Sequence, residues 1–329
     1  MPTSQRKKRH HFISECYLKH FADEDGRVWE FRKDDPKTAH RRSYSEVGYH
    51  KHFYAQPLPC GGTDHNTLEN FWSTIESTWH PLVERIRRGD DITSRRAELY
   101  QFMTMCRVRI PAARDLIEIN RAEMVRTTIQ HLDKMGRLPP KPTGLENILD
   151  KLIVSIDPHQ SIHAMPALAQ GLAQILCRVG YEIIVNETDI EFVTSDNPVA
   201  YFDPRVAEES MKPYTIDRQD WAIELVFPID TKHCLHGHSD LGFQFLRDGI
   251  VYRRVSHRPA IKRINRVLVR FGYKSIYARS KAIAPAVCKY ARVSPIGKTT
   301  RLAQDNGTLL ILQQEFGPRP RKPKWKKGT

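Results

Sequence analysis

Apolar side chains recur every three or four positions through the middle of the chain, which is the spacing of one face of an α-helix. The first run predicts a helix over residues 66–88 with Asn66 as its N-cap. Its apolar face consists of Leu68, Phe71, Trp72, Ile75 and Trp79. A second helix is expected over residues 93–134, kinked or restarted at Pro111, because proline removes a helix N–H donor.

The pattern changes after Gly180, where short apolar runs bounded by turn residues predict strands: YEIIVN, IEFVTS, AIELVFPI, HCLHGH and GIVYRRV. Two shorter helices are expected before them, over residues 144–156 and 161–179, and a basic helix after them, over residues 257–271. Near the start, residues 14–21 indicate a short helix and GRVWEFRK a strand. GTLLILQQ, near the end, is apolar but ambiguous in type.

Segregation of helices and strands favours an α+β fold over a doubly wound sheet. We predict a helical middle region packed with a mostly antiparallel sheet formed largely by the C-terminal half. The N-terminal strands have too few neighbours to form a sheet alone, so residues 12–315 are expected to form one composite domain, with a proline-rich linker at 136–144. A basic arm over residues 1–11 and a basic disordered tail over residues 316–329 would flank this domain.

Composition narrows the class of protein. Hydrophobic residues make up 40% of the 329 residues, enough for a sizeable core. No run of about 18 uncharged apolar residues is present, so no membrane span is expected. The opening MPTSQRKKRHHF lacks the apolar segment of a secretory signal. The six cysteines are scattered singly without a CxxC pair, which indicates a reducing, cytoplasmic location.

Charge is concentrated at the two ends of the chain. The formal net charge is +14, of which residues 6–9 contribute +4 and six Lys or Arg residues after Glu315 contribute +6. Basic arms of this kind commonly contact phosphate backbones without reading bases, so the termini are candidate nucleic-acid contacts. A solvated tail, or contact with another anionic surface, is the alternative.

Polar residues at two places are candidates for chemistry. In TSDNP, residues 194–198, Asp196 could cap an Asx turn, or Asp196 and Asn197 could project into a cleft as ligands for metal or substrate. Glu69 and Glu76 lie two turns apart on one helix, about 10.5 Å along its axis, too far for one metal to bind both directly. They could instead pair with arginines of the next helix.

Two further motifs are candidates for a nucleotide site and a zinc site. SPIGKTT, residues 294–300, contains Gly-Lys-Thr but has Arg292 where a P-loop needs its first glycine, so we reject nucleotide hydrolysis there. Cys234, His236 and His238 alternate along a strand and share one face, a spacing that suits two zinc ligands but makes three awkward.

A series of short motifs resembles the DUF4238 family. The motifs are HFI at residues 11–13, YLKHF at 17–21, GRVWEFRK, HFYA, the helix with Glu69 and Glu76, RIP at 109–111, TSDNP, and Phe227-Pro228. Each is weak alone, and their order from about residue 10 to 230 gives the set its specificity. Ser14 departs from the family pattern, where many relatives are expected to have proline, but serine also begins a helix.

The resemblance implies a widespread, mainly bacterial family without an assigned function. It points to six polar positions that match family motifs: His11, Glu69, Glu76, Arg109, Asp196 and Asn197. Such residue types are the usual parts of a metal-dependent phosphodiester-cleaving site. On this hypothesis Glu69, Glu76 and Asp196 hold a divalent metal. His11 is the general base, Arg109 clamps the phosphate, and Asn197 completes the catalytic set.

We therefore expect a cytoplasmic α+β protein that acts on nucleic acid, as a metal-dependent nuclease of a defence or toxin type. The alternative is a non-catalytic protein that binds nucleic acid or an acidic partner through its basic termini. A third possibility is that the six residues form a buried structural network. An enzyme should lose activity but keep its fold and its affinity for nucleic acid when Asp196→Ala is made. A binder should instead lose salt-dependent affinity when residues 317–329 are removed.

Overall fold

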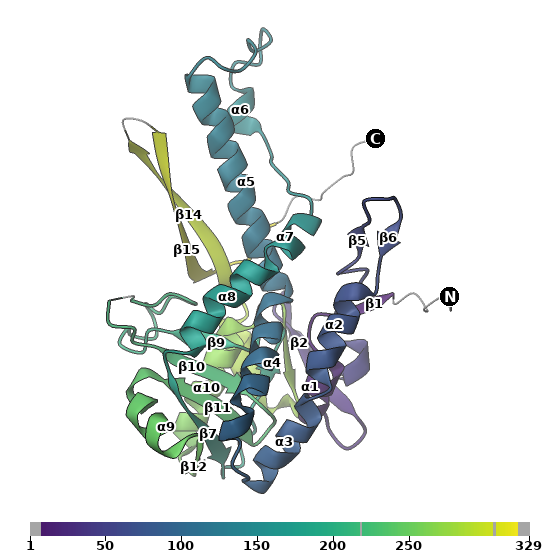
Figure 1. Ribbon diagram of the computed structural model, residues 1–329, viewed down its shortest axis with the longest axis vertical. Helices are drawn as coiled ribbons and strands as arrows, with labels where there is room; N and C mark the ends of the chain where they lie inside the picture. Colours follow the sequence, from purple (N-terminus) through teal and green to yellow (C-terminus); the bar gives the residue numbers. More distant parts are fainter. Residues whose placement is uncertain (1–7, 218, 305–306, 322–329) are drawn as a thin grey trace.

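The computed structural model describes residues 8–217, 219–304 and 307–321 (Figure 1). The chain has an α+β fold, as the segregated patterns predict. Within the described residues, no helix is both long and apolar enough to span a bilayer. The helices are α1 (Glu15–Leu18), α2 (Thr67–Glu76), α3 (Trp79–Arg88), α4 (Arg96–Val108), α5 (Pro111–Lys134), α6 (Ile148–Lys151), α7 (His159–His163), α8 (Met165–Leu176), α9 (Gly242–Asp248), α10 (Arg258–Phe271) and α11 (Ala284–Tyr290).

The strands form two larger sheets and three strand pairs. The five-stranded sheet has the order β12-β7-β11-β10-β9, and the four-stranded sheet has the order β3-β2-β13-β8. The pairs are β1–β4, β5–β6 and β14–β15. The strands are β1 (Arg9–His11), β2 (Arg27–Arg32), β3 (Asp35–Ser43), β4 (Tyr49–Lys51), β5 (Gln56–Pro57), β6 (Thr63–Asp64), β7 (Gly180–Asn186), β8 (Thr194–Ser195), β9 (Ala200–Phe202), β10 (Glu224–Pro228), β11 (His233–His238), β12 (Val251–Val255), β13 (Ser275–Ala278), β14 (Ser294–Gln304) and β15 (Gly307–Gly317).

The predicted antiparallel character of the sheets is confirmed, with β12 parallel to β7 as an exception. The four-stranded sheet joins the two ends of the fold, because β2 pairs with β13. This pairing gives the N-terminal strands the partners that they lack nearby in the sequence. It is the reason that the opening strands and the C-terminal half share one sheet.

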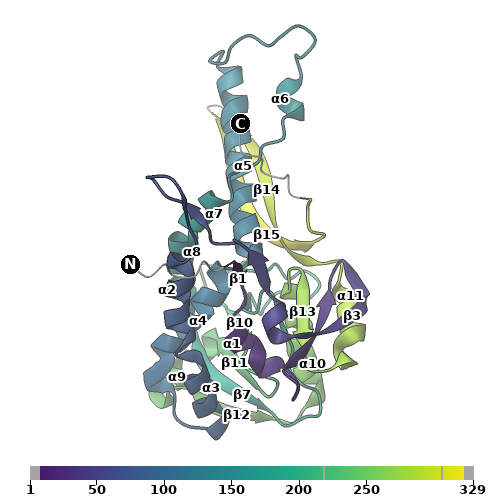
Figure 2. The same ribbon diagram turned by 90° about the vertical axis from the view of Figure 1, so that its right-hand side faces the viewer.

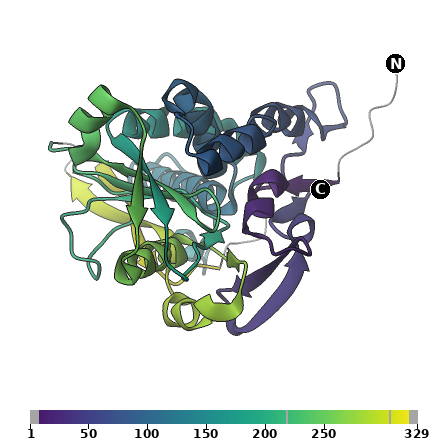
Figure 3. The ribbon, with the colours of Figure 1, turned by 90° about the horizontal axis from the view of Figure 1, so that it is seen from below.

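The five-stranded sheet is covered on both faces, which explains why its inner strands β7 and β10 are buried along almost their whole length. Side chains alternate along each strand. On one face, Ile183 and Phe227 pack in the same core cluster as α3 and α4, and on the other, Ile184 and Val226 pack with α10. Viewed from below, the dark-blue helices lie on one side of the green strands and the yellow-green helices on the other (Figure 3).

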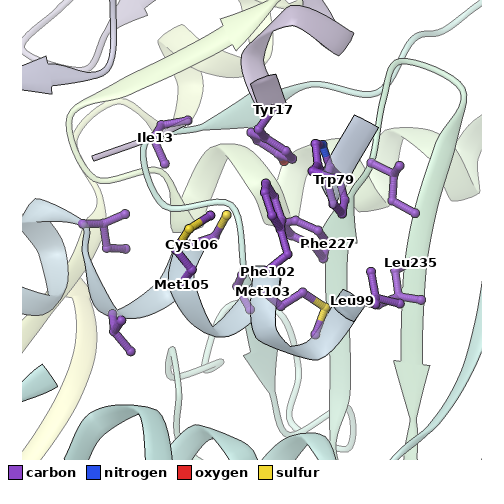
Figure 4. Packing of buried hydrophobic residues seen from close by; sticks show 14 of the residues in the cluster. Ile13, Tyr17, Trp79, Leu99, Phe102, Met103, Met105, Cys106, Phe227 and Leu235 are labelled. Carbon is purple, nitrogen blue, oxygen red and sulfur yellow. The ribbon is translucent and has the colours of Figure 1, made fainter. Parts of the chain in front are cut away.

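Aromatic side chains from distant segments form the centre of the larger core. The rings of Trp79 and Phe102 stack with centroids 3.9 Å apart, and Tyr17 stacks on Phe227 at 5.5 Å (Figure 4). The Tyr17 hydroxyl donates a hydrogen bond to the carbonyl of Pro228 at 2.7 Å. One buried ring cluster therefore fixes α1, α3, α4 and β10 relative to one another.

The long helix α5 and the β14–β15 hairpin project together from the rest of the molecule (Figures 1 and 2). Leu116 of α5 approaches Gly297 of β14 so closely that a Cβ there would lie 2.7 Å from its Cδ1. Arg301 of the hairpin forms an ion pair with Glu123 of α5. GTLLILQQ, ambiguous from its sequence, is part of β15.

Some predicted elements differ from the observed ones. The helix expected over residues 66–88 is two helices, because Pro81 cannot donate to Ser77 and its ring would clash with that carbonyl. The hydroxyl of Thr78 also returns to the carbonyl of Ile75 at 2.9 Å. The helix expected over 144–156 is the four-residue α6, and the one expected over 161–179 is divided between α7 and α8.

The ends of the chain were predicted to be a basic arm and a basic tail. Most of both predictions lies outside the described residues, because residues 1–7 and 322–329 are not among them. Of the remainder, Arg9–His11 form β1, which pairs with β4, and β15 continues to Gly317. The boundaries drawn at residues 11 and 316 therefore fall beside or within strands.

Candidate functional site

Arg109 joins the N-terminal segment to α2. Its side chain is buried, with Nε donating to the carbonyl of Phe12 at 3.1 Å, Nη2 to Ser14 Oγ at 2.7 Å and Nη1 to Glu76 Oε1 at 2.8 Å. The Ser14 hydroxyl also donates to Glu76 Oε1 at 2.6 Å. Arg109 occupies the turn between α4 and α5 because Pro111 begins α5 and holds the residue before it in an extended conformation.

His11 lies beside this network. Its Nδ1 is 3.3 Å from Glu15 Oε1, and its Nε2 is 3.3 Å from the carbonyl of Ser45. Burial lowers the pKa of His11, against the opposing charge of Glu15, which favours the neutral imidazole. The charges of Arg109 and Glu76 also act on this ring, which brings three of the six predicted residues together.

Glu69 reaches the same region through Tyr54. Burial raises the pKa of Tyr54, and the charge of Glu69 adds to that rise while the charge of Arg109 opposes it. The Tyr54 hydroxyl donates to the carbonyl of Arg109 at 2.8 Å. Four of the six predicted residues, from β1, α2 and the α4–α5 turn, therefore belong to one neighbourhood.

Asp196 and Asn197 bind a different part of the fold, the turn that follows α10. Both Asp196 oxygens accept backbone N–H groups at 2.7 Å, from Tyr273 and from Lys274. The Asn197 amide donates to the carbonyl of Phe271 at 2.7 Å. Both side chains are buried. TSDNP thus fastens β8 to the α10–β13 turn, and its polar groups are used within the protein.

Lys33 holds the same turn from the other side. Its Nζ donates to the carbonyls of Val269 at 2.9 Å and Gly272 at 2.7 Å, at the C-terminus of α10. Burial lowers the pKa of Lys33 to about 7, against the opposing charge of Asp196. Asp196 and Lys33 therefore act together on one turn, as acceptor of its N–H groups and donor to its carbonyls.

The three carboxylates predicted as metal ligands, Glu69, Glu76 and Asp196, are not arranged as one site. In the described part of the chain, no group of three or more His, Cys, Asp and Glu side chains is placed to hold a metal ion. Glu76 is bound by Arg109 and Ser14, and Asp196 by two backbone N–H groups. A metal at Glu76 Oε1 or at Asp196 would have to compete with these donors.

A second polar cluster lies between the five-stranded sheet and α10. His236 Nδ1 is 2.7 Å from Glu182, and its Nε2 is 3.5 Å from Glu224. Arg253 donates two hydrogen bonds to Glu182, and Arg263 donates two to Glu224. Of these residues, His236, Glu224, Arg253 and Arg263 border a cavity of about 230 Å³.

The zinc hypothesis concerned this same strand. Cys234 is buried among apolar side chains, and both His236 nitrogens face carboxylates. Sequence analysis did not find the cluster as a whole, since Glu182 and Glu224 come from strands far apart in the chain. In the sequence, Glu182 and Glu224 each stand as a single acid within an otherwise apolar strand pattern. A charge in such a place needs a partner.

A basic cavity of about 770 Å³ lies between α10, α11 and the β7–β8 connection. Its charged lining consists of Asp189, Glu191, Arg258, Lys262, Arg266, Arg279 and Lys289, five cations against two acids. Arg258 pairs with Asp189, and Arg279 lies 3.6 Å from Glu191. Lys262 and Lys289 are exposed and form no ion pair within the described ranges.

The six predicted residues line none of four cavities formed by the described residues. The largest, about 820 Å³, is an apolar groove between α2, α4 and α8. It lies on α2, the helix that carries Glu69 and Glu76, but is lined there by Phe71, Trp72 and Ile75.

Residues 9–282 match the family described as "Protein of unknown function (DUF4238)". The chain belongs to the DUF4238 family. The match includes all six predicted residues and both sheets, and it ends before α11 and the β14–β15 hairpin. No curated protein and no solved structure matches this DUF4238 protein.

Proposed function

We propose that this DUF4238 protein binds nucleic acid, with the basic cavity between α10 and α11 as the place where phosphates are held. The observation that carries the proposal is the excess of five cations over two acids in that cavity. The chain as a whole supports it with a formal net charge of +14. Contacts between such cations and phosphates supply most of sequence-independent affinity.

Lys262 and Lys289 are the residues best suited to this role. Both are exposed, and neither is neutralised by a carboxylate among the described residues. Lys289 Nζ lies 5.4 Å from the centroid of the Tyr290 ring, which also lines the cavity. Proteins that bind single-stranded nucleic acid combine lysines, which contact the phosphate backbone, with aromatic rings, on which bases stack.

Binding is favoured over cleavage by the surroundings of two of the predicted metal ligands. Glu76 and Asp196 accept hydrogen bonds from the protein itself. Metal-dependent nuclease activity would require new ligand geometry around them. The six unpaired cysteines support the cytoplasmic location proposed for this nucleic-acid-binding protein.

The test is fluorescence anisotropy with labelled single-stranded and duplex oligonucleotides over a range of salt concentrations. We expect Lys262→Glu with Lys289→Glu to weaken binding at least about tenfold and to flatten the salt dependence, since each lost phosphate contact removes roughly 0.7–0.9 from the log–log slope. The matched control carries Lys51→Glu and Lys151→Glu, which make the same charge change at exposed residues outside the cavity.

Equal affinity in the two double variants would refute the cavity as the binding site. Undiminished binding by the cavity variant, together with loss after removal of residues 317–329, would favour contact through the basic tail instead. Adding Mg²⁺ to the same mixtures tests the nuclease alternative. Cleavage products that disappear in Glu76→Gln would establish chemistry at the Arg109 network.

A further inference from the structure

Arg107, on α4, is a buried cation without a hydrogen-bonded partner. Its residue is 3% exposed, and Nε and Nη1 have no hydrogen-bond acceptor among the described residues. Among the residues that the structure describes, Arg107 forms no ion pair. Its guanidinium carbon lies 3.9 Å from the centroid of the Tyr214 ring. A buried charge that lacks an acceptor is costly, so its presence needs a physical explanation.

Two other buried arginines nearby in the sequence, Arg109 and Arg114, donate hydrogen bonds to acceptors of the protein, as expected for a structural role. Arg109 donates to Phe12, Ser14 and Glu76. Arg114 donates to Ser161 Oγ at 2.8 Å and to the carbonyl of Pro158 at 2.7 Å. Arg107 differs from both because its buried Nε and Nη1 have no acceptor among the described residues.

Arg107 also lines a cavity of about 470 Å³ between α5, α8, the β9–β10 connection and β15. The volume is within the range of small-molecule sites. No residue that lines it is Asp or Glu, so the protein supplies the cavity with one positive charge and no counter-charge. The remaining polar lining is Thr215 and the amides of Asn120, Gln174, Gln313 and Gln314, and the aromatic lining is Tyr201, Tyr214 and Trp221.

The aromatic wall is held in an unusual backbone conformation. Tyr214 has φ of 57° and Trp221 has φ of 52°, and they are two of the three non-glycine residues with positive φ in the described part of the chain. Bulky side chains adopt this left-handed region at an energetic cost. The Tyr214 hydroxyl donates to Asn197 Oδ1 at 2.9 Å, which helps to keep the ring over Arg107.

We propose that this cavity binds a small organic oxyanion, a carboxylate or phosphate attached to a planar group. The guanidinium of Arg107 would bind the oxygens, because its planar fork matches both kinds of oxyanion. Tyr214 and Trp221 contact the planar group, and the amides of Gln174 and Gln313 hydrogen-bond its polar edges. This site is separate from the basic cavity of the proposed function, and its ligand is a small molecule.

The experiment measures binding of three probes to the full-length protein by calorimetry and by thermal unfolding. Adenosine 5′-monophosphate and indole-3-acetate represent the phosphate and carboxylate arms, and inorganic phosphate lacks the planar group. We expect at least one organic probe to bind and to raise Tm. Arg107→Met should weaken that binding at least tenfold. Without ligand, it should leave Tm unchanged or higher, because it removes an unpaired buried charge.

Arg114→Met is the matched control, since it makes the same change at a buried arginine with protein acceptors. It should lower Tm. Gln313→Glu, on the exposed hairpin, is a second way to abolish binding by placing a negative charge in the cavity wall. Absence of binding by both organic probes would overturn the proposal, as would equal binding of inorganic phosphate. A fall in Tm for Arg107→Met as large as that for Arg114→Met would show a structural role instead.

Discussion

Buried charged residues in this DUF4238 protein differ in whether the protein itself supplies their hydrogen-bond partners. Arg109 and Asp196 are both fully satisfied by groups of the protein, which is the pattern of residues that fix backbone segments. Arg107 has donors with no protein acceptor among the described residues. Polar residue type alone does not separate these cases, because the same side chain serves either purpose.

Asp196→Ala is predicted to destabilise the fold. The change leaves the buried N–H groups of Tyr273 and Lys274 without acceptors, at a cost of roughly 1–3 kcal/mol for each unsatisfied group. Urea denaturation should show a free energy of unfolding lower by about 2–4 kcal/mol. The same substitution at exposed Asp189 should change it by less than about 0.5 kcal/mol.

If Asp196→Ala were as stable as the wild-type protein, the role of TSDNP in holding the turn after α10 would be contradicted. The sequence-based expectation that the variant keeps its fold would then stand. The two expectations differ because the sequence places Asp196 at a strand end but does not reveal what lies across from it. The turn after α10 is more than 70 residues further along the chain, as the 77-residue separation of Asp196 and Tyr273 shows.

At the scale of elements, local patterns predicted helices and strands well where a single cause acts. The basic helix expected over residues 257–271 is α10, and the restart at Pro111 is confirmed. The break between α2 and α3 was missed because the apolar spacing continues through it while Pro81 interrupts the hydrogen bonds. The position of His11, Glu76 and Arg109 in one neighbourhood followed from family motifs, whereas the His236 cluster required the sheet register.

The His236 cluster predicts a pH dependence of the contact between the sheet and α10. Burial would raise the pKa of Glu224, but hydrogen bonds from Arg263 and His236 outweigh it and lower that pKa to about 2. For Glu182, hydrogen bonds from His236 and Arg253 likewise outweigh the effect of burial and lower its pKa to about 2. For His236, burial is outweighed by its two carboxylates, which raise its pKa.

The directions of these pKa shifts define two pH ranges in which the cluster stabilises the fold. The contribution of the carboxylates is present above about pH 4.5, their ordinary pKa, and is lost as pH falls toward 2. The contribution of His236 is complete below about pH 6.5 and is lost as pH rises through its raised folded-state pKa. Stability from this cluster is therefore greatest between those limits.

Glu224→Gln should lower the free energy of unfolding by about 2 kcal/mol near pH 6, because charged hydrogen bonds to Arg263 are replaced by weaker ones. It should also reduce the loss of stability on acidification below pH 4.5. Urea denaturation at several pH values measures both. Glu187→Gln, at an exposed glutamate, is the control. Identical acid profiles for the two variants would show that the cluster contributes nothing.

At the scale of the whole molecule, the opening strands and the C-terminal half depend on each other. Beyond the β2–β13 pairing, the buried Ser275 hydroxyl donates to Glu30 at 3.0 Å across 245 residues. Apolar periodicity carries no information about such long-range partners. The sequence could therefore predict that the N-terminal strands needed partners, but not that β13 was one of them.

This dependence predicts the result of cutting the chain in its middle. A specific protease site inserted into the proline-rich segment at residues 136–144 should yield two fragments that stay together in gel filtration, because both the four-stranded sheet and the main core contain residues from each. Denaturing electrophoresis would show the cut. Elution of two separate native species would contradict the prediction of one composite domain.

The β2–β13 pairing also sets an order of events during synthesis. Ribosomes add roughly 5–20 residues each second, so β2 leaves the exit tunnel many seconds before residue 275 exists. Until then the nascent chain displays an unpaired strand edge flanked by unburied rings. Chaperone capture of ribosome-bound chains should consequently persist until β13 emerges, and products truncated before Ser275 should accumulate in inclusion bodies.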